Sequence, residues 1–216
     1  MIYRLFNILY SIYFNLRYLP FRVGIKLPIL MRTNMKVDKL HKGQIIVGDV
    51  RMFSIKLGGG KSPAMNASKG CIRLDRQSII MFEGKATISE GTVIRCDKGG
   101  TIKFGDNYYC NCNCYFRSGS MISFGDNCSL GWNVTINTSD GHYIWHKNVK
   151  VDMDGPVRIG NHVWLTPDVS ILKNASIPDN CIVAQKSVVT KEFKDEHCLI
   201  GGIPAKVISN NIDWKN

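Results

Sequence analysis

The chain is poor in acidic residues. Its 216 residues hold 17 Asp and Glu against 28 Lys and Arg, a formal net charge of +11, while apolar residues make up an ordinary 44%. The positive excess favours an anionic partner, whether a phosphate ligand, an acidic polymer, nucleic acid or a membrane surface, without choosing among them. The length suits one domain, alone or with an appendage.

The chain also lacks a long apolar run. The aromatic N-terminal stretch is interrupted before ~20 apolar residues accumulate, so it predicts no transmembrane helix, and it lacks the cleavage site of a signal peptide. The interruptions are Arg4, Asn7, Asn15, Arg17, Pro20, Arg22 and Lys26. Eight cysteines are present, but disulfide frameworks are typical of small secreted chains. We therefore expect free thiols and a cytoplasmic protein.

Internal repetition is the strongest feature that is present. The segment GTIKFGDN, which begins at Gly100, returns as GSMISFGDN at an offset of 20 residues. Farther along, bulky apolar residues recur every six positions, at Ile159, Leu165, Ile171, Ile177, Val183 and Val189. Small or β-branched residues follow four positions later, at Val163, Val169, Ala175, Cys181 and Ser187. A helix repeats near 3.6 residues and a half-buried strand at 2, so neither explains a period of six.

A period of six is typical of a triangular β-helix, in which each hexad forms one face and the bulky residue fills the interior. Earlier hexads align at Phe82, Ile88, Ile94, Phe104, Cys110, Phe116, Phe124, Leu130 and Ile136. We predict an all-β fold with a parallel β-helix over residues 46–190. An N-terminal appendage would occupy 1–45, an inserted loop 137–158, where the register breaks, and a C-terminal extension 191–216.

Four cysteines fall into this repeat. Cys114, Cys128 and Cys181 take the small inward position, and Cys110 takes the aliphatic one. The CNCNC run alternates along a predicted strand, so its thiols do not converge on a tetrahedral metal ion. We interpret these cysteines as packing residues of the core and expect no metal site.

The basic, aromatic segment ahead of the repeats predicts a helix over its first ~18 residues, with a break at Pro20. Two interpretations stay open. The segment packs across the first coils or a neighbouring subunit, or it docks on anionic lipid with Arg4, Arg17, Arg22 and Lys26 facing the headgroups.

Three motifs extend the register: DGH at 140–142, IGNHVW at 159–164, and SVVTK at 187–191 followed by GIPAKVI at 202–208. With the hexads, they resemble the hexapeptide-repeat acyltransferases. The segment YFNLRYLPF…IKLPIL and the C-terminal NIDW also resemble the subgroup that O-acetylates capsule and lipopolysaccharide sugars. The resemblance implies a left-handed β-helix, acetyl-CoA as donor, and a homotrimer with active sites between subunits.

His142 is the candidate general base. A sugar hydroxyl needs a base within hydrogen-bond reach, and the ordinary pKa of His lies nearest the working pH. His142 follows Asp140 and Gly141 in the loop that breaks the register, and the family's catalytic His falls at this Gly-His step. The other histidines are weaker candidates: His41, His146, His162 and His197.

The resemblance assigns further site residues. Trp164 matches an aromatic residue beside the thioester; it precedes the inward Leu165, so it should point outward, into the ligand groove or a subunit contact. Asn111 matches a residue that contacts the acceptor sugar, as Asp140 and His142 would, and Asp140 and Trp164 are expected to be catalytic together with His142. Donor contacts are implied for Trp164, Thr166, Ala184, Gln185, Lys186, Thr190, Lys191 and Lys206. Lysine suits phosphate as a point charge, although each of these lysines alone fits a solvated surface.

One departure from the family concerns the oxyanion. Relatives often carry a Gly and an amide-bearing residue after the Trp and its following aliphatic, whereas this chain has Thr166 and Pro167. Because Pro has no N–H, another donor must act, and Thr166 is one possibility.

The leading hypothesis is a cytoplasmic O-acetyltransferase that acts on a surface polysaccharide or its sugar precursor. In the lipid-docking interpretation of its N-terminal segment, it is also in peripheral contact with the inner face of the membrane. The alternatives are an acetyltransferase for an amino sugar, serine or antibiotic, and a non-catalytic trimeric scaffold. Zinc-dependent carbonic anhydrases with the same fold hold zinc with three His, and the five His of this chain lack a convincing spacing for such ligands. Nucleic-acid binding has only charge in its favour.

Overall fold

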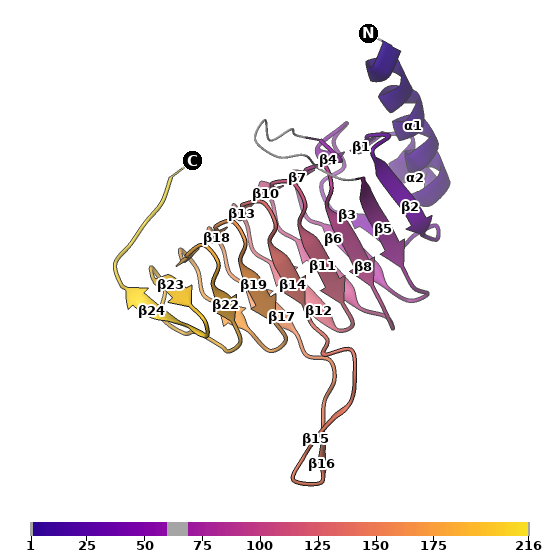
Figure 1. Cartoon of the computed structure of the whole chain (residues 1–216). Helices are drawn as coiled ribbons and strands as arrows, with labels where there is room; N and C mark the ends of the chain where they lie inside the picture. Colours follow the sequence, from indigo (N-terminus) through magenta and orange to yellow (C-terminus); the bar gives the residue numbers. More distant parts are fainter. Residues whose placement is uncertain (1, 60–68, 216) are drawn as a thin grey trace.

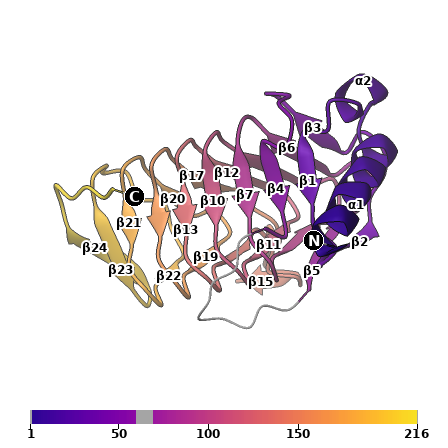
Figure 2. The ribbon, with the colours of Figure 1, turned by 90° about the horizontal axis from the view of Figure 1, so that it is seen from above.

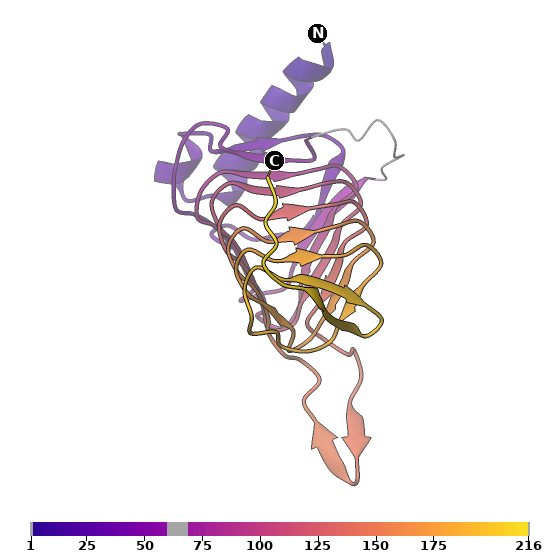
Figure 3. The ribbon, with the colours of Figure 1, turned by 90° about the vertical axis from the view of Figure 1, so that its left-hand side faces the viewer.

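The computed structural model describes residues 2–59 and 69–215, whose short, mainly parallel strands and the turns between them are wound into a prism (Figure 1). Two helices come first, α1 (Ile2–Tyr18) and α2 (Phe21–Gly24). The strands form three main sheets, named A, B and C here, and the chain visits them in the repeating order A, B, C. Figure 3 looks along the stack and shows the coils behind one another.

Each sheet takes one strand from each coil. Sheet A contains β1 (Ile29–Met31), β4 (Ile55–Leu57), β7 (Ala86–Ile88), β10 (Tyr108–Cys110), β13 (Ser129–Leu130), β18 (Trp164–Leu165), β21 (Ile182–Val183), β23 (Leu199–Gly202) and β24 (Ala205–Ser209). Sheet B contains β2 (Met35–Lys39), β5 (Gly70–Leu74), β8 (Val93–Cys96), β11 (Tyr115–Ser118), β14 (Thr135–Asn137), β19 (Ser170–Leu172) and β22 (Val188–Val189). Sheet C contains β3 (Ile45–Val47), β6 (Ile79–Phe82), β9 (Thr101–Phe104), β12 (Met121–Phe124), β17 (Val157–Ile159) and β20 (Ser176–Ile177). Among the described strands of these three sheets, only β24 runs antiparallel to its neighbour, β23.

The predicted six-residue register coincides with the buried side chains. All the bulky positions from Phe82 to Val189 are at most 3% exposed, and the small positions four residues later are buried as well. In sheet C, Phe104 stacks between Phe82 and Phe124 of the adjacent coils, with ring centroids 5.0 and 5.5 Å away. The prediction of a parallel β-helix is therefore confirmed.

The repeated FGDN sequence forms the corner between sheets C and A. Gly125 has no room for a side chain, because a Cβ there would lie 2.5 Å from Oδ1 of Asn161 in the next coil. The Asp126 carboxylate accepts the Asp106 N–H of the preceding coil at 2.7 Å. Asn127 adopts a left-handed backbone with φ of 58°, which Asn tolerates better than most residues. The Gly, Asp and Asn of the motif thus each meet a steric or hydrogen-bonding requirement of this corner.

All eight cysteines are free, and seven of them are buried. Burial raises the pKa of the Cys96 and Cys128 thiols to about 12. Cys110, Cys114 and Cys128 belong to the continuous apolar core. Their interpretation as packing residues is confirmed.

Helix α1 packs along the free edge of sheet A at the first coil. The Ser11 hydroxyl donates to Met31 O at 3.1 Å and accepts the Met31 N–H at 2.9 Å. The Asn15 side chain donates to Ile29 O at 2.6 Å and accepts the Ile29 N–H at 3.1 Å. These side chains satisfy the backbone groups of β1 that a further strand would otherwise bind.

The coil extends past both predicted boundaries. Strands β1 and β2 start it within the segment 1–45, and β23 continues sheet A within 191–216. Insertions hide the period at the start: Ile29 pairs with Ile55, and Met35 pairs with Gly70, offsets of 26 and 35 residues. A coil of three hexads takes only ~18 residues.

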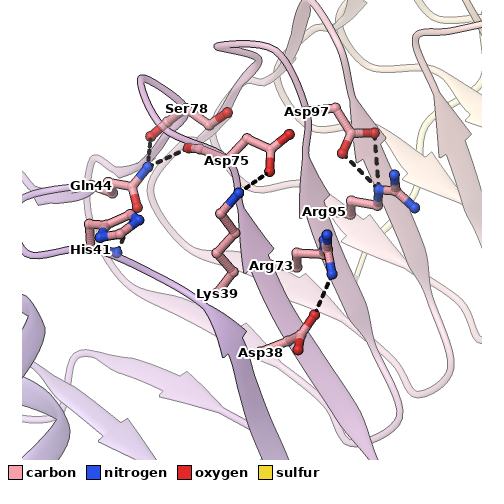
Figure 4. Close-up of polar contacts among 9 residues, drawn as sticks. All are labelled: Asp38, Lys39, His41, Gln44, Arg73, Asp75, Ser78, Arg95 and Asp97. Carbon is pink, nitrogen blue, oxygen red and sulfur yellow. Dashed lines mark hydrogen bonds and ion pairs between the residues drawn. The ribbon is translucent and has the colours of Figure 1, made fainter.

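Ion pairs link the outer side chains of sheet B (Figure 4). Lys39 binds Asp75 at 2.7 Å, Arg73 binds Asp38 at 2.7 Å, and Arg95 binds Asp97 at 2.8 Å. In the next coil, Arg117 binds the same Asp97 at 3.0 Å. Burial raises the pKa of Asp97, but its hydrogen bonds from the two arginines outweigh burial and hold that pKa below its ordinary value.

Candidate active site

Several predicted site residues line one groove of about 500 Å³, where the chain leaves sheet A for sheet B. The lining comes from four consecutive coils, at or just after β10, β13, β18 and β21. The groove is lined by Tyr109, Asn111, Ser129, Leu130, Gly131, Trp132, Trp164, Thr166, Pro167 and Gln185. Stacking of the coils thus brings Asn111, Trp164, Thr166 and Gln185 together.

Asn111 is held by its own backbone. Its Oδ1 accepts the Cys112 N–H at 2.8 Å. Among the described residues its Nδ2 has no protein acceptor, so this amine remains available to a ligand hydroxyl.

Trp164 points outward, as its position before Leu165 predicts, and is 37% exposed. Trp214 of the C-terminal tail lies beside it, with ring centroids 5.9 Å apart. Trp214 also stacks on His162 at 4.3 Å and 4°, and its indole N–H donates to His162 O at 2.9 Å. His162 takes the corner position that Asn fills in other coils, and its φ is 52°.

Both hydrogen-bond donors of Thr166 bond to the backbone of the next coil. Its N–H and its hydroxyl both bond to Val183 O, at 3.1 and 2.7 Å. The following Pro167 sits against Gly131, where a Cβ would lie 2.6 Å from the proline nitrogen. Neither donor of Thr166 is therefore available to a ligand in the groove, whereas the indole N–H of Trp132 is unpaired among residues 2–59 and 69–215.

The inserted loop leaves the prism between sheets B and C and ends in a hairpin, β15 (Ile144–His146) and β16 (Val149–Val151) (Figure 1). Its base is firmly attached. The Lys173 ammonium pairs with the Asp140 carboxylate and donates to Asp152 O at 2.5 Å, and the Asp140 N–H donates to Met153 O at 2.9 Å. Lys98 approaches Asp154 at 3.8 Å.

His142 stands just beyond this base and is exposed. Gly141 before it has φ of 79°, a conformation that favours glycine. Asp140 forms an ion pair with Lys173, which anchors the base of the loop. Among the described residues, it makes no hydrogen bond with the imidazole of His142. The structure thus presents His142 to solvent on an anchored base.

The predicted site residues form two groups, at the two corners of the prism that flank sheet B. Asn111, Thr166 and Ala184–Lys186 follow strands of sheet A, at the A-to-B corner. Asp140, His142, Thr190 and Lys191 follow strands of sheet B, at the B-to-C corner. Lys206 lies on β24 and pairs with Gly201, where a Cβ would lie 3.0 Å from the Cβ of Ala184 in the first group. One chain does not bring His142 to the groove.

Three groove or near-groove aromatics were missed by the sequence reasoning: Tyr109, Trp132 and Trp214. Outward positions of a β-helix follow no apolar pattern, so only their aromatic character signals a binding surface. Within the described residues no group of three His, Cys, Asp or Glu side chains is arranged to hold a metal ion.

Comparison with known proteins places the chain in a family. No family model matches it. It is 31% identical over 142 residues to the galactoside O-acetyltransferase of Escherichia coli K12, covering 62% of this chain and 68% of that protein. It is 35% identical over 113 residues to a Staphylococcus aureus protein whose name assigns it to the acetyltransferases and gives no substrate, covering 52% of this chain. The chain spans little more than half, 56%, of that relative.

A solved structure agrees in fold. The polySia-specific acetyltransferase NeuO superposes with a TM-score of 0.57 at 20% identity, over 84% of this chain and 82% of that one. The fold is the left-handed parallel β-helix that the resemblance implied. The chain belongs to the hexapeptide-repeat acyltransferase family.

Proposed function

We propose that the protein transfers an acetyl group from acetyl-CoA to a hydroxyl of a surface polysaccharide or its sugar precursor. The observation that carries this proposal is the groove, in which Asn111, Trp164, Thr166 and Gln185 converge from three coils. Its size and its indole walls fit a narrow, largely apolar pantetheine arm. Lys186 follows Gln185 at its border and suits a phosphate.

The active site would form between subunits of a trimer. His142 and the groove lie at different corners of the prism, so a neighbouring chain that lays its loop over the groove would complete the site. The anchored base of the loop supports this arrangement, because it holds the projecting hairpin at a defined angle to the coil.

In this site acetyl-CoA would supply the thioester carbon that is attacked. His142 accepts the proton of the acceptor hydroxyl as its oxygen forms a bond to that carbon. Trp164 walls the reacting group, and Asn111 Nδ2 binds the acceptor. The indole N–H of Trp132 is available to the oxyanion. When the carbon–sulfur bond breaks, His142 returns the proton to the sulfur, so the products are the acetyl ester and free coenzyme A.

Polysaccharide acceptors are supported by the O-acetyltransferases of sugars among the similar proteins. An acetyltransferase for an amino sugar, serine or antibiotic would use the same groove, and a screen of acceptors with acetyl-CoA separates these possibilities. The free cysteines fit the reducing cytoplasm, where acetyl-CoA is available.

His142→Ala tests the proposal. We expect acetyl transfer, measured as release of the coenzyme A thiol, to fall about 100-fold or more, while calorimetric binding of coenzyme A stays as in the wild type. His146→Ala is the matched control, because His146 is an exposed histidine in the same inserted loop. Near-normal turnover in His142→Ala would contradict the assignment, and absence of coenzyme A binding would favour a scaffold.

Co-expression tests the shared site. A mixture of His142→Ala and Trp164→Ala chains is expected to regain activity that neither homo-oligomer has, because some sites would pair an intact His142 loop with an intact groove. If both residues acted from the same chain, mixing would restore nothing.

A further inference from the structure

Helix α1 is apolar on the side that faces away from the protein. Its inward side carries Ser11, Phe14 and Asn15, which pack on or bond to the first coil. The outward residues of α1 and the start of α2, called the N-terminal apolar face here, are each between 43% and 68% exposed: Leu5, Phe6, Leu9, Tyr13, Leu16 and Phe21.

Such a surface is unusual for a helix in contact with water. A surface helix normally turns polar and charged residues outward, and a helix that is apolar on all sides is buried. Contiguous exposed apolar patches mark interaction sites. The N-terminal apolar face therefore needs a covering partner.

The surrounding charge identifies the kind of partner. The first 37 residues contain no Asp or Glu, and their six cations are Arg4, Arg17, Arg22, Lys26, Arg32 and Lys36. The first four are exposed, and none of these four forms an ion pair in the described part of the chain. A two-fold contact of this face with the same face of a second copy would bring two such cationic surfaces together, which is unfavourable. An anionic surface satisfies both the charge and the apolar face.

The helix is suited to lie in an interface rather than to cross a bilayer. In the described residues no helix is long and apolar enough to span a membrane. Arg4 and Arg17 stand near the two ends of α1, where they can reach headgroups while the residues between them enter the acyl boundary. The helix sits at the end of the prism away from the C-terminus, so the coils would not obstruct the bilayer (Figure 2).

We propose that the N-terminal apolar face docks the protein on an anionic lipid bilayer. Leu5, Leu9 and Leu16 enter the interface, and the surrounding arginines and lysine bind acidic headgroups. This association goes beyond acetyl transfer and does not require it, because α1 contributes no residue to the groove or the inserted loop.

Vesicle flotation of the full chain tests the proposal. We expect the protein to float with vesicles of phosphatidylcholine mixed with phosphatidylglycerol and to float much less with phosphatidylcholine alone. The triple variant Leu5→Ser, Leu9→Ser, Leu16→Ser should lose binding to both. The double variant Arg17→Gln, Arg22→Gln should bind anionic vesicles more weakly, by roughly fivefold for each cation removed. Its binding to vesicles of phosphatidylcholine alone should not change.

Ile208→Ser is the matched control, since Ile208 is 60% exposed on β24 at the opposite end of the prism, and it should bind vesicles as the wild type does. The mass of each variant in solution is measured by light scattering. Wild-type protein that ignores anionic vesicles, or a triple variant that still binds them, would overturn the proposal. A triple variant that breaks the oligomer would assign the face to a second copy instead. Acetyl transfer to a soluble acceptor should be unchanged in the triple variant, so failure here is distinct from failure of the proposed activity.

Discussion

Trp214 holds the C-terminal tail against sheet A, and its removal is expected to free that tail without unfolding the coil. The indole is 8% exposed, stacks on His162 at 4.3 Å, and donates to His162 O at 2.9 Å. Trp214→Ala removes the stack and the hydrogen bond together. Trp214→Phe keeps an aromatic ring for the stack and loses only the hydrogen bond.

The expected size follows from these two contacts. An aromatic pair contributes about 1 kcal/mol beyond its buried area, and a hydrogen bond contributes about 1 kcal/mol. Trp214→Ala should therefore weaken tail docking by at least about 2 kcal/mol, and Trp214→Phe by about 1 kcal/mol. Because 1.4 kcal/mol is a factor of ten, the tail should open about 30-fold and about 5-fold more often.

Hydrogen exchange measures this opening. The Ile212 amide donates to His197 O at 2.9 Å and reports on the tail, while the Trp164 amide donates to Cys181 O at 2.9 Å and reports on the coil. We expect faster exchange at Ile212 with unchanged exchange at Trp164.

His162→Asn separates the stack from the backbone. Asn holds the same left-handed corner at residues 107, 127 and 180, with φ of 54°, 58° and 60°. The substitution should keep the coil and speed exchange at Ile212 about 5-fold or more, because the stack and the bond between His162 Nε2 and Trp214 O at 3.1 Å are both lost. Unchanged Ile212 exchange in both Trp214→Ala and His162→Asn would refute the role given to the stack.

Two further predictions concern the coil itself. Gly125→Ala should lower the free energy of unfolding by about 2 kcal/mol in urea denaturation, because its Cβ would press on Asn161 of the next coil. An unchanged midpoint of urea denaturation would contradict this prediction, because it would show that the coils accommodate the added methyl group. The raised pKa of Cys96, about 12, means that the unfolded thiol ionises first as pH rises above 9, so stability is lost between pH 9 and 12. Cys96→Ala should flatten this loss by about 1.4 kcal/mol per pH unit at most, and parallel stability profiles would contradict it.

The sequence predicted the coil well wherever hexads ran without interruption. Bulky residues such as Ile171 and Val183 repeat because each fills the same interior position in successive coils. The first coil was harder to find, since pairs such as Met35 and Gly70 are separated by an insertion. A spacing rule fails where the chain leaves the coil and returns.

The site was predicted in parts. Trp164 was correctly predicted to point outward, and the structure adds that it shares a groove with Asn111. The separation of His142 from that groove follows from which corner each occupies, which requires counting hexads around the prism. The contact between Trp214 and His162 spans 52 residues and lies outside any repeat, so no local pattern signals it.

The prism also acts as a spacer of fixed length. Strands of sheet A stack about 4.8 Å apart, and β10 to β21 stand three to six places beyond β1. If α1 rests on a bilayer with the stack upright, the groove is held roughly 15 to 30 Å beyond β1, and the part of α1 outside the lipid adds to that height. Adding or deleting one whole coil would raise or lower that height by a single step. A glycan attached to the membrane would then be modified at a set distance from its anchor, with the number of coils as the measure.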